Sequence, residues 1–436
     1  MAQRGEDLRN PVIVIPGILG SRLVDAQTGQ RVWGSFDSKF ANPREADGLR
    51  TFSLPMEQGQ PLSALTDSVV ADGPLDDVEV RFLGLPVRLR AYRDVLMSLG
   101  VGGYRDETEG SRGVDYGDAH FTSFQFAYDW RRDNAENAAK LSAFIEEKAA
   151  YVAAERKRRY GYEGPVKFDI VAHSMGGLVA RYYLRYGDQR LDPAAPPALN
   201  WAGAQRVDNL ILVGTPSAGS IQAFEELLTG KDYPGPLPNY PAASLGTFPS
   251  IYQLLPRERH RAWQWAGSQV GVRGLYDVAT WERFSWGLTD AAAKAPLEDL
   301  LPDVYAASQR RAIAREHLAK CLAQAEAFHA ALDTPARPPE GTSIYLVAGD
   351  AASTPAVAVL ERETGALVEV LEAAGDGTVL RSSALADERL DRANADQVRL
   401  VSPVDWHAVT FLFSDHLGMT KDPAFTDNVL FILLEK

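Results

Sequence analysis

The sequence predicts an α/β fold, in which helices cover both faces of a mostly parallel sheet. Short apolar runs rich in β-branched residues alternate along the chain with segments of helical periodicity. The clearest apolar run, Val12–Ile15, ends at Pro16-Gly17 and is typical of a strand buried on both faces. The length of 436 residues favours a single domain, residues 1–436, that carries insertions.

The remaining elements follow in alternation. After residues 12–15 we expect strands at residues 121–127, 168–172, 209–213, 344–348 and 398–401. We expect helices at residues 134–157, 176–186 and 311–332, and a closing helix at residues 425–434. Strands that are separated by helices in this way form parallel sheets, because each connection must cross back over the sheet.

Two regions interrupt this alternation, at about residues 33–120 and 219–340. The first is rich in Gly, Pro and Asp, and the second becomes aromatic after a Pro-rich stretch. We predict that both are insertions at one end of the sheet and that the second forms a cap or lid. The aromatic side chains of the second either form the core of this cap or line an acyl pocket. The candidates for contact with a substrate are Leu19, Trp263, Trp265, Trp281 and Trp286.

Charge and cysteine content narrow the range of partners. The net charge of −13 argues against nucleic acid, since a surface that binds nucleic acid normally needs an excess of basic residues. The basic run at residues 156–159 is either a solvated helix end or a patch that binds an anion or lipid headgroup. The single cysteine, Cys321, excludes an intrachain disulfide and fits a packed position in a helix.

The sequence gives no sign of a metal, a cofactor or a membrane span. The seven histidines are scattered without the spacing of metal ligands, and no Gly-rich phosphate loop stands out. No apolar stretch approaches the ~20 residues that cross a bilayer. Residues 1–10 are polar, so we expect no signal peptide and predict a cytoplasmic location.

The most informative segment is residues 168–177, with the sequence FDIVAHSMGG. A buried strand runs directly into Ser174 and then into a helix, which is the pattern of a nucleophile elbow. The sharp turn needs small residues two positions before and after the serine, and Ala172 and Gly176 stand there. We therefore predict an α/β-hydrolase fold in which Ser174 is the catalytic nucleophile.

A serine nucleophile needs a base, and the base needs an orienting acid. In this fold the acid and then the base follow the serine in the chain. The preferred acid is Asp376 in the sequence GDGTV at residues 375–379, and the alternative is Asp350, after the strand at residues 344–348. The preferred base is His416, ahead of the closing helix, with His407 as the alternative.

An oxyanion hole requires two backbone N–H donors that face the developing negative charge. The first is expected from Met175, directly after the nucleophile. The second is expected from Ile18 in the loop PGILG, residues 16–20, which follows the first strand. The loop at residues 214–219 either keeps the floor of the site open with small residues or is an ordinary turn.

Five motifs together resemble the lecithin:cholesterol acyltransferase family, which includes lysosomal phospholipase and phospholipid:diacylglycerol acyltransferases. They are PVIVIPGILGSRL at residues 11–23, YDWR at 128–131, AHSMG at 172–176, GDGTV at 375–379 and HLGM at 416–419. They occur in the family's order and span most of the chain. The two insertions match no family motif, and the disulfides of secreted members have no counterpart in a chain with one cysteine.

The resemblance implies acyl transfer through an acyl-enzyme, with Ser174, Asp376 and His416 as the triad. It implies a structural role near the site for the YDWR segment, where Asp129 and Arg131 are expected to pair. We expect a hydrolase that acts on carboxylic, lipid-like esters. The alternatives are an acyltransferase that passes the acyl group to an alcohol and a catalytically inactive binding protein. A transient contact of the cap with a membrane surface is a further expectation.

Overall fold

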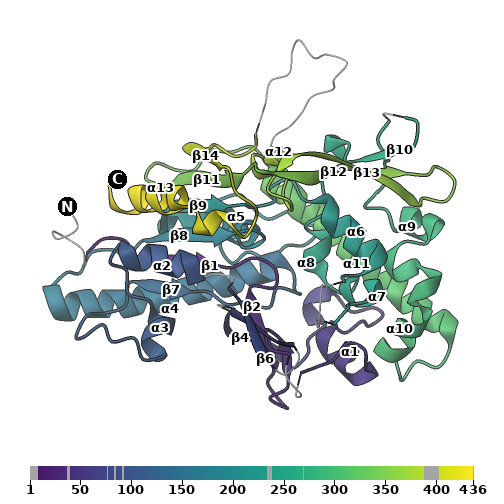
Figure 1. Cartoon of the computed structure of the whole chain (residues 1–436), viewed down its shortest axis with the longest axis horizontal. Helices are drawn as coiled ribbons and strands as arrows, with labels where there is room; N and C mark the ends of the chain where they lie inside the picture. The colour runs from purple at the N-terminus through teal and green to yellow at the C-terminus, as the bar shows by residue number, and fades with distance from the viewer. Residues whose placement is uncertain are drawn as a thin grey trace, which may run out of the picture.

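The computed structural model describes residues 8–36, 40–75, 77–82, 85–90, 93–232, 238–268, 270–386 and 402–435. At its centre is a six-stranded sheet with the strand order β14-β11-β9-β8-β1-β7, and all neighbouring strands are parallel (Figure 1). The strands are β1 (Val12–Ile15), β7 (Ser123–Gln125), β8 (Phe168–His173), β9 (Val207–Val213), β11 (Ser343–Gly349) and β14 (Ala408–Leu412).

The inner strands β1 and β8 are buried on both faces, as their continuous apolar sequences predict. Ile13 and Ile15 of β1 pack into one core with helices α4 (Asn134–Tyr160) and α5 (Gly176–Tyr186). Val12 and Val14 point to the opposite face, where α2 (Arg93–Val101) and α13 (Pro423–Leu434) complete a second core. Successive strand residues face opposite ways, so one short run supplies both cores. The predicted fold class is confirmed.

Most predicted elements of the core are present with small differences in their ends. The strand expected at residues 121–127 is shorter, because only Ser123–Gln125 pairs with β1. The helix expected at residues 311–332 is part of the longer α11 (Ala307–Asp333), and its Cys321 is buried. The strand expected at residues 398–401 lies outside the described residues. The sixth strand of the sheet, β14, was not predicted.

The basic run lies at the C-terminal end of α4, as expected. Gly161 ends the helix in the left-handed conformation, with φ 65°. Lys157 pairs with Glu163, while Arg158 and Arg159 share Glu155. Arg156 turns inward instead, where it is buried and donates to the backbone oxygen of Arg9. These local partners fit the interpretation as a helix end, although Arg156 is not solvated.

The region of residues 33–120 adds small elements beside the central sheet. They are β2 (Ser21–Asp25), which precedes the region, β3 (Arg31–Trp33), α1 (Ala46–Phe52), β4 (Val69–Pro74), β5 (Asp77–Phe82), β6 (Leu85–Arg90), α2 and α3 (Glu107–Ser111). The strands β3, β2 and β4 form a separate sheet in that order. The subdivision of the chain into one domain with two insertions stays a prediction.

The region of residues 219–340 is mainly helical. Its elements are α6 (Ile221–Thr229), α7 (Ala242–Leu245), α8 (Pro249–Tyr252), β10 (Trp263–Trp265), α9 (Val278–Phe284), α10 (Lys294–Leu300) and α11. Figure 1 shows these helices at the right, with the purple α1 beside the green α10. Arg50 of α1 donates to the backbone oxygen of Asp299 in α10 at 2.8 Å, so the two regions contact each other directly.

A long hairpin connects the helical region to the central sheet. Its strands β12 (Ala352–Leu360) and β13 (Leu367–Gly375) are antiparallel, and β12 also pairs with β10. The short helix α12 (Arg381–Ala384) follows the hairpin. The far end of the hairpin pairs with β10, and its near end leads into the loop that carries Asp376. The alternation of strands and helices in the sequence does not predict this hairpin.

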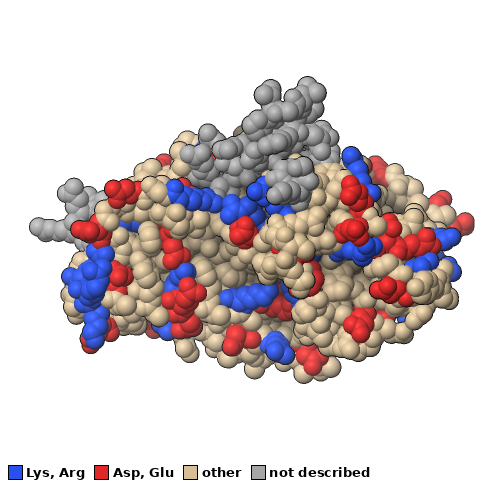
Figure 2. Space-filling view, turned by 90° about the horizontal axis from the view of Figure 1, so that it is seen from below, with Lys and Arg blue, Asp and Glu red and all other residues tan. Residues whose placement is uncertain are grey.

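Figure 2 shows the charged side chains on one face of the molecule. In Figure 2, acidic and basic side chains are interspersed over the face that is drawn. Within the part of the chain that the structure describes, no helix is both long enough and apolar enough to cross a membrane.

Candidate active site

Ser174 occupies a sharp turn between β8 and α5. Its backbone lies in the left-handed region, with φ 53°, which a residue with a side chain adopts only when its surroundings hold it there. Its N–H donates to the backbone oxygen of Val213 on the neighbouring strand at 2.8 Å. A Cβ atom at Gly176 would lie 2.3 Å from the backbone oxygen of Pro16, so this position requires glycine. The turn has the geometry predicted for a nucleophile elbow.

The structure brings Ser174, His416 and Asp376 together from three distant parts of the chain. Nε2 of His416 lies 3.0 Å from Oγ of Ser174, and Nδ1 lies 2.7 Å from Oδ2 of Asp376. Ser174 and Asp376 are buried, with 7% and 2% of their surfaces exposed. The loops that follow strands of a parallel sheet meet at one edge of that sheet, which explains how residues so far apart in the sequence converge.

The carboxylate of Asp376 is held in place from its other side. Oδ1 accepts hydrogen bonds from the backbone N–H groups of Thr378 at 3.0 Å and Val379 at 2.7 Å. The backbone oxygen of Asp376 accepts from the N–H of His416 at 2.9 Å. These bonds fix the carboxylate toward the imidazole, so Nδ1–H of His416 can donate to it and Nε2 can accept from the serine hydroxyl.

The alternative acid and base lie elsewhere. Asp350 is partly exposed, and its carboxylate lies 3.5 Å from the guanidinium of Arg381. The expected position of His407 after the last strand is wrong. His407 directly precedes β14, and its N–H donates to the backbone oxygen of Ile344. The geometry favours Asp376 and His416, because these two residues form the hydrogen-bonded chain that leads to Ser174.

The two backbone amides expected to form an oxyanion hole lie on neighbouring loops. Met175 follows Ser174 and precedes the first turn of α5, where N–H groups have no acceptor within the helix. Ile18 lies in the loop after β1, and β1 pairs with β8 up to Ile15 and Ala172. Neither amide donates to an acceptor among the described residues. Both are therefore available to a ligand.

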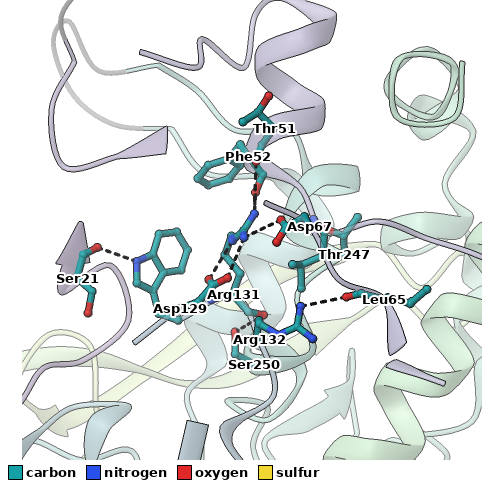
Figure 3. A network of polar contacts seen from close by, with 12 residues as sticks. Ser21, Thr51, Phe52, Leu65, Asp67, Asp129, Arg131, Arg132, Thr247 and Ser250 are labelled. Carbon is teal, nitrogen blue, oxygen red and sulfur yellow. Dashed lines mark hydrogen bonds and ion pairs between the residues drawn. The ribbon is translucent and has the colours of Figure 1, made fainter. Parts of the chain in front are cut away.

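The YDWR segment forms a buried polar network beside this loop (Figure 3). Arg131 donates through Nε and Nη2 to both carboxylate oxygens of Asp129, at 3.0 and 2.8 Å. Its Nη2 also lies 2.8 Å from Asp67, and its Nη1 donates to the backbone oxygen of Phe52 at 2.9 Å. The expected pairing of Asp129 with Arg131 is present, and the guanidinium also ties in two segments of the region 33–120.

Most of the aromatic candidates for substrate contact lie inside the protein. Trp263, Trp281 and Trp286 are at most 5% exposed and pack against Phe224 with ring centroids 5.1–6.1 Å apart. The indole N–H groups of Trp281 and Trp286 are both used by backbone oxygens, at 2.6 and 2.9 Å. These three side chains form the core of the helical region, so the packing interpretation fits them.

The other two candidates are partly exposed. Trp265 lies at the end of β10, where its ring packs 5.6 Å from that of Phe284. Leu19 lies in the loop after β1 beside Ile18, and its backbone has φ 63°. Leu19 is the candidate that lies next to the triad loops.

His173 and Thr354 support the loops that carry the base and the acid, and the sequence alone does not reveal this role. Nε2 of His173 lies 3.1 Å from the backbone oxygen of His416, and burial, together with the nearby His416, lowers the pKa of His173 to about 3. His173 is therefore neutral at physiological pH and can donate to that oxygen. Thr354 of β12 accepts from the N–H of Gly377 at 2.8 Å, which steadies the acid loop. The position of His173 beside the nucleophile was the available signal, whereas nothing in the sequence pairs Thr354 with Gly377.

The loop at residues 214–219 closes one side of the site. Gly214 has φ 55°, and a Cβ atom there would lie 3.3 Å from the ring of His416. Thr215 packs so closely on α5 that a Cβ atom at Gly177 would collide with its hydroxyl. The small residues thus leave space for the imidazole and the elbow helix. Among the described residues, no group of His, Cys, Asp or Glu has the arrangement of a metal site.

Comparison with known proteins agrees with this architecture. Residues 116–289, which include Tyr128 to Arg131 and Ser174, match the lecithin:cholesterol acyltransferase family. No curated protein matches the sequence at a significant level. A chain in the crystal structure of the Tle4–Tli4 complex is similar in fold, with a TM-score of 0.57, 16% identity and 97% of each chain covered.

Two further solved structures are more distant. EstA from Clostridium botulinum has a TM-score of 0.34 and 13% identity, covering 98% of this chain and 88% of its own. Lipase 1 from Pelosinus fermentans has a TM-score of 0.34 and 12% identity, covering 98% and 99%. The family match confirms the resemblance seen in the motifs. The chain has an α/β-hydrolase fold and is similar over residues 116–289 to this family of acyltransferases.

Proposed function

We propose that the protein is a serine hydrolase that cleaves apolar carboxylic esters through an acyl-enzyme on Ser174. The observation that carries the proposal is the continuous chain of contacts from Ser174 Oγ to His416 and on to Asp376, at 3.0 and 2.7 Å. This geometry meets the requirement of general-base catalysis, in which the base lies within hydrogen-bond reach of the proton that it removes.

The reaction begins with attack of Ser174 Oγ on the ester carbonyl carbon, while Nε2 of His416 takes the hydroxyl proton. Asp376 stabilises the imidazolium that forms and keeps Nδ1–H oriented. The carbonyl oxygen becomes negative and is stabilised by the backbone N–H groups of Ile18 and Met175. Collapse of the tetrahedral intermediate breaks the ester bond, and Nε2–H of His416 protonates the leaving alcohol. Water then attacks the acyl-enzyme by the reverse use of the same groups.

The surroundings of His416 support an apolar substrate. Phe413 and Leu417 stand on either side of it in the sequence and are 86% and 51% exposed. Contact with an acyl chain would remove the exposed apolar surface of such side chains from water, which is favourable. The family that residues 116–289 match is named for an enzyme that transfers acyl groups from a phospholipid, which is consistent with this substrate class.

The same family name favours acyl transfer as a second candidate function. An acyl-enzyme on Ser174 can react with an alcohol in place of water, and the protein groups that take part are the same. The two functions differ in the nucleophile that resolves the acyl-enzyme, so they can be separated by the product.

The test is turnover of p-nitrophenyl esters from acetate to palmitate by the full chain. We expect activity that increases with acyl length beyond acetate and is lost in Ser174→Ala. Ser98→Ala, which removes another buried hydroxyl on α2 away from the triad, serves as the matched control. Addition of a primary alcohol separates the two candidates, because a transferase would form the new alkyl ester in place of free acid. Equal activity in wild type and Ser174→Ala would refute the proposal.

A further inference from the structure

The loop that carries Ile18 has a strained backbone. Residues 16–21 connect β1 to β2 through a turn in which Gly20 N–H donates to Gly17 O at 3.1 Å. Leu19 lies inside this turn with φ 63°. A branched side chain rarely adopts the left-handed region, because Cβ then lies too close to the following backbone. Such a conformation persists only where neighbouring groups hold it.

Four hydrogen bonds from buried groups hold this turn. The hydroxyl of Tyr128 donates to Pro16 O at 2.9 Å, and the indole N–H of Trp33 donates to Leu19 O at 2.8 Å. The indole N–H of Trp130 donates to Ser21 O at 3.1 Å, and the backbone N–H of Tyr128 donates to Ser21 Oγ at 3.0 Å. The turn is thus fixed at its start, its strained residue and its end.

The donors cannot easily move with the turn. Trp33, Tyr128 and Trp130 are each at most 5% exposed. The rings of Trp33 and Trp130 pack edge to face at 5.7 Å, and both contact aromatic rings of the helical region, Trp33 at Tyr240 and Trp130 at Phe248. Packed aromatic side chains have few alternative positions. The position of the turn is therefore set by a rigid aromatic cluster.

The turn also touches the nucleophile elbow. β1 and β8 are neighbours, with Ile15 opposite Ala172, so their following loops leave the sheet side by side. The backbone oxygen of Pro16 lies within 2.3 Å of where a Cβ of Gly176 would be. A small displacement of the turn would alter the separation between the amide of Ile18 and that of Met175. Oxyanion donors act only within a narrow range of distances, about 2.7–3.1 Å from the oxygen that they stabilise.

We propose that Tyr128, Trp33 and Trp130 are positioning residues that hold the strained turn at residues 16–21 in the shape required for the Ile18 amide to stabilise the oxyanion. This inference rests on the proposed function, and it assigns a role in the reaction to the YDWR segment. The three side chains act through the backbone of the turn and need not contact the substrate.

Tyr128→Phe and Trp33→Phe test the proposal, because each removes one donor and keeps an aromatic ring. Loss of a complete oxyanion donor costs about 10²–10³-fold in kcat, and we expect about 10- to 100-fold here, since the donor is displaced rather than removed. KM should change by less than about threefold. Binding of a trifluoromethyl ketone, which forms a tetrahedral adduct with the serine, should weaken by the same factor as kcat/KM falls.

Tyr186→Phe is the matched control, because its buried hydroxyl donates to the backbone oxygen of Ala331 at 2.7 Å, away from the turn. It should lose similar thermal stability and keep wild-type kcat. The proposal is overturned if Tyr128→Phe and Trp33→Phe lose no more kcat than this control, or if KM alone changes. If the positioning role is overturned in this way, the proposed function is still supported as long as the wild type is active and Ser174→Ala is inactive. Absence of ester turnover in the wild type would instead refute both.

Discussion

Substitution of Arg131 by methionine should destabilise the protein strongly, because Arg131 is the centre of a buried charge network. Its guanidinium is fully buried and contacts Asp129, Asp67 and the backbone of Phe52. Burial on its own raises the pKa of Asp129, but the charge and hydrogen bonds of Arg131 hold that pKa below its ordinary value. Without Arg131, Asp129 would be a buried carboxylate with no cationic partner.

The expected cost of Arg131→Met is about 3–5 kcal/mol in the free energy of unfolding, which is typical when one partner of a buried pair is removed. Asp67 contributes less to this cost, because 20% of its side chain is exposed and water can solvate it. The double variant Arg131→Met with Asp129→Asn removes the uncompensated charge and should recover about 1–3 kcal/mol. The penalty of the single variant should shrink as the pH falls, since protonation neutralises the orphaned carboxylate.

Urea unfolding followed by tryptophan fluorescence provides the measurement, with wild type, both single variants and the double variant compared at pH 7 and pH 5. The midpoint should fall in Arg131→Met while the slope with urea stays the same. An unfolding free energy of Arg131→Met within about 0.5 kcal/mol of the wild-type value would show that Arg131 does not stabilise the buried network. A double variant whose loss equals the sum of the two single losses would show that the pair does not interact.

Asp376→Asn should lower kcat by about 10⁴-fold and leave the fold intact, because the imidazole of His416 loses its orienting anion. Steady-state kinetics would measure kcat, and circular dichroism would show whether the variant is folded. Gly176→Ala should lower the unfolding free energy by about 1–3 kcal/mol in urea titrations, because its Cβ would lie 2.3 Å from the backbone oxygen of Pro16. Gly100→Ala is the control, because a Cβ at Gly100 would meet no atom within 4 Å and should not lower the unfolding free energy. Burial lowers the pKa of His317 to about 4, so between pH 6.5 and 4 the unfolded chain binds more protons than the folded protein. The free energy of unfolding should therefore fall as the pH falls through this range. In urea titrations, His317→Asn should reduce this dependence of the unfolding free energy on pH by up to about 1.4 kcal/mol per pH unit.

The central strands could be predicted because their sequence signal is local. β1 and β8 are apolar on both faces and end at a turn, so a few residues suffice to identify them. The hairpin β12–β13 lacks such a signal, since most of β13 is exposed and neither strand alternates clearly between apolar and polar residues. β14 has only five residues and depends on its pairing with β11, which lies more than 60 residues earlier in the chain.

In the candidate site too, residues in local motifs could be predicted from the sequence, and residues that act through long-range contacts could not. Ser174 and Asp376 lie in motifs in which glycine is required because a larger residue would collide with neighbouring atoms. The sequence alone therefore identifies both residues as candidates. The support of the turn at residues 16–21 by Trp33 and Tyr128 depends on contacts across 14 and 112 positions, which no local pattern reveals. The burial of Trp281 could not be predicted either, because an aromatic run in an insertion fits a core and a pocket equally well.

The catalytic role of Ser174 is tested most directly by identifying the residue that forms the covalent intermediate. The full chain would be treated with a fluorophosphonate, and the labelled peptide would be located by mass spectrometry in wild type, Ser174→Ala and His416→Ala. We expect one stoichiometric label on Ser174, none in Ser174→Ala and labelling slowed by orders of magnitude in His416→Ala. Label on another serine, or equal labelling rates in wild type and His416→Ala, would contradict this expectation.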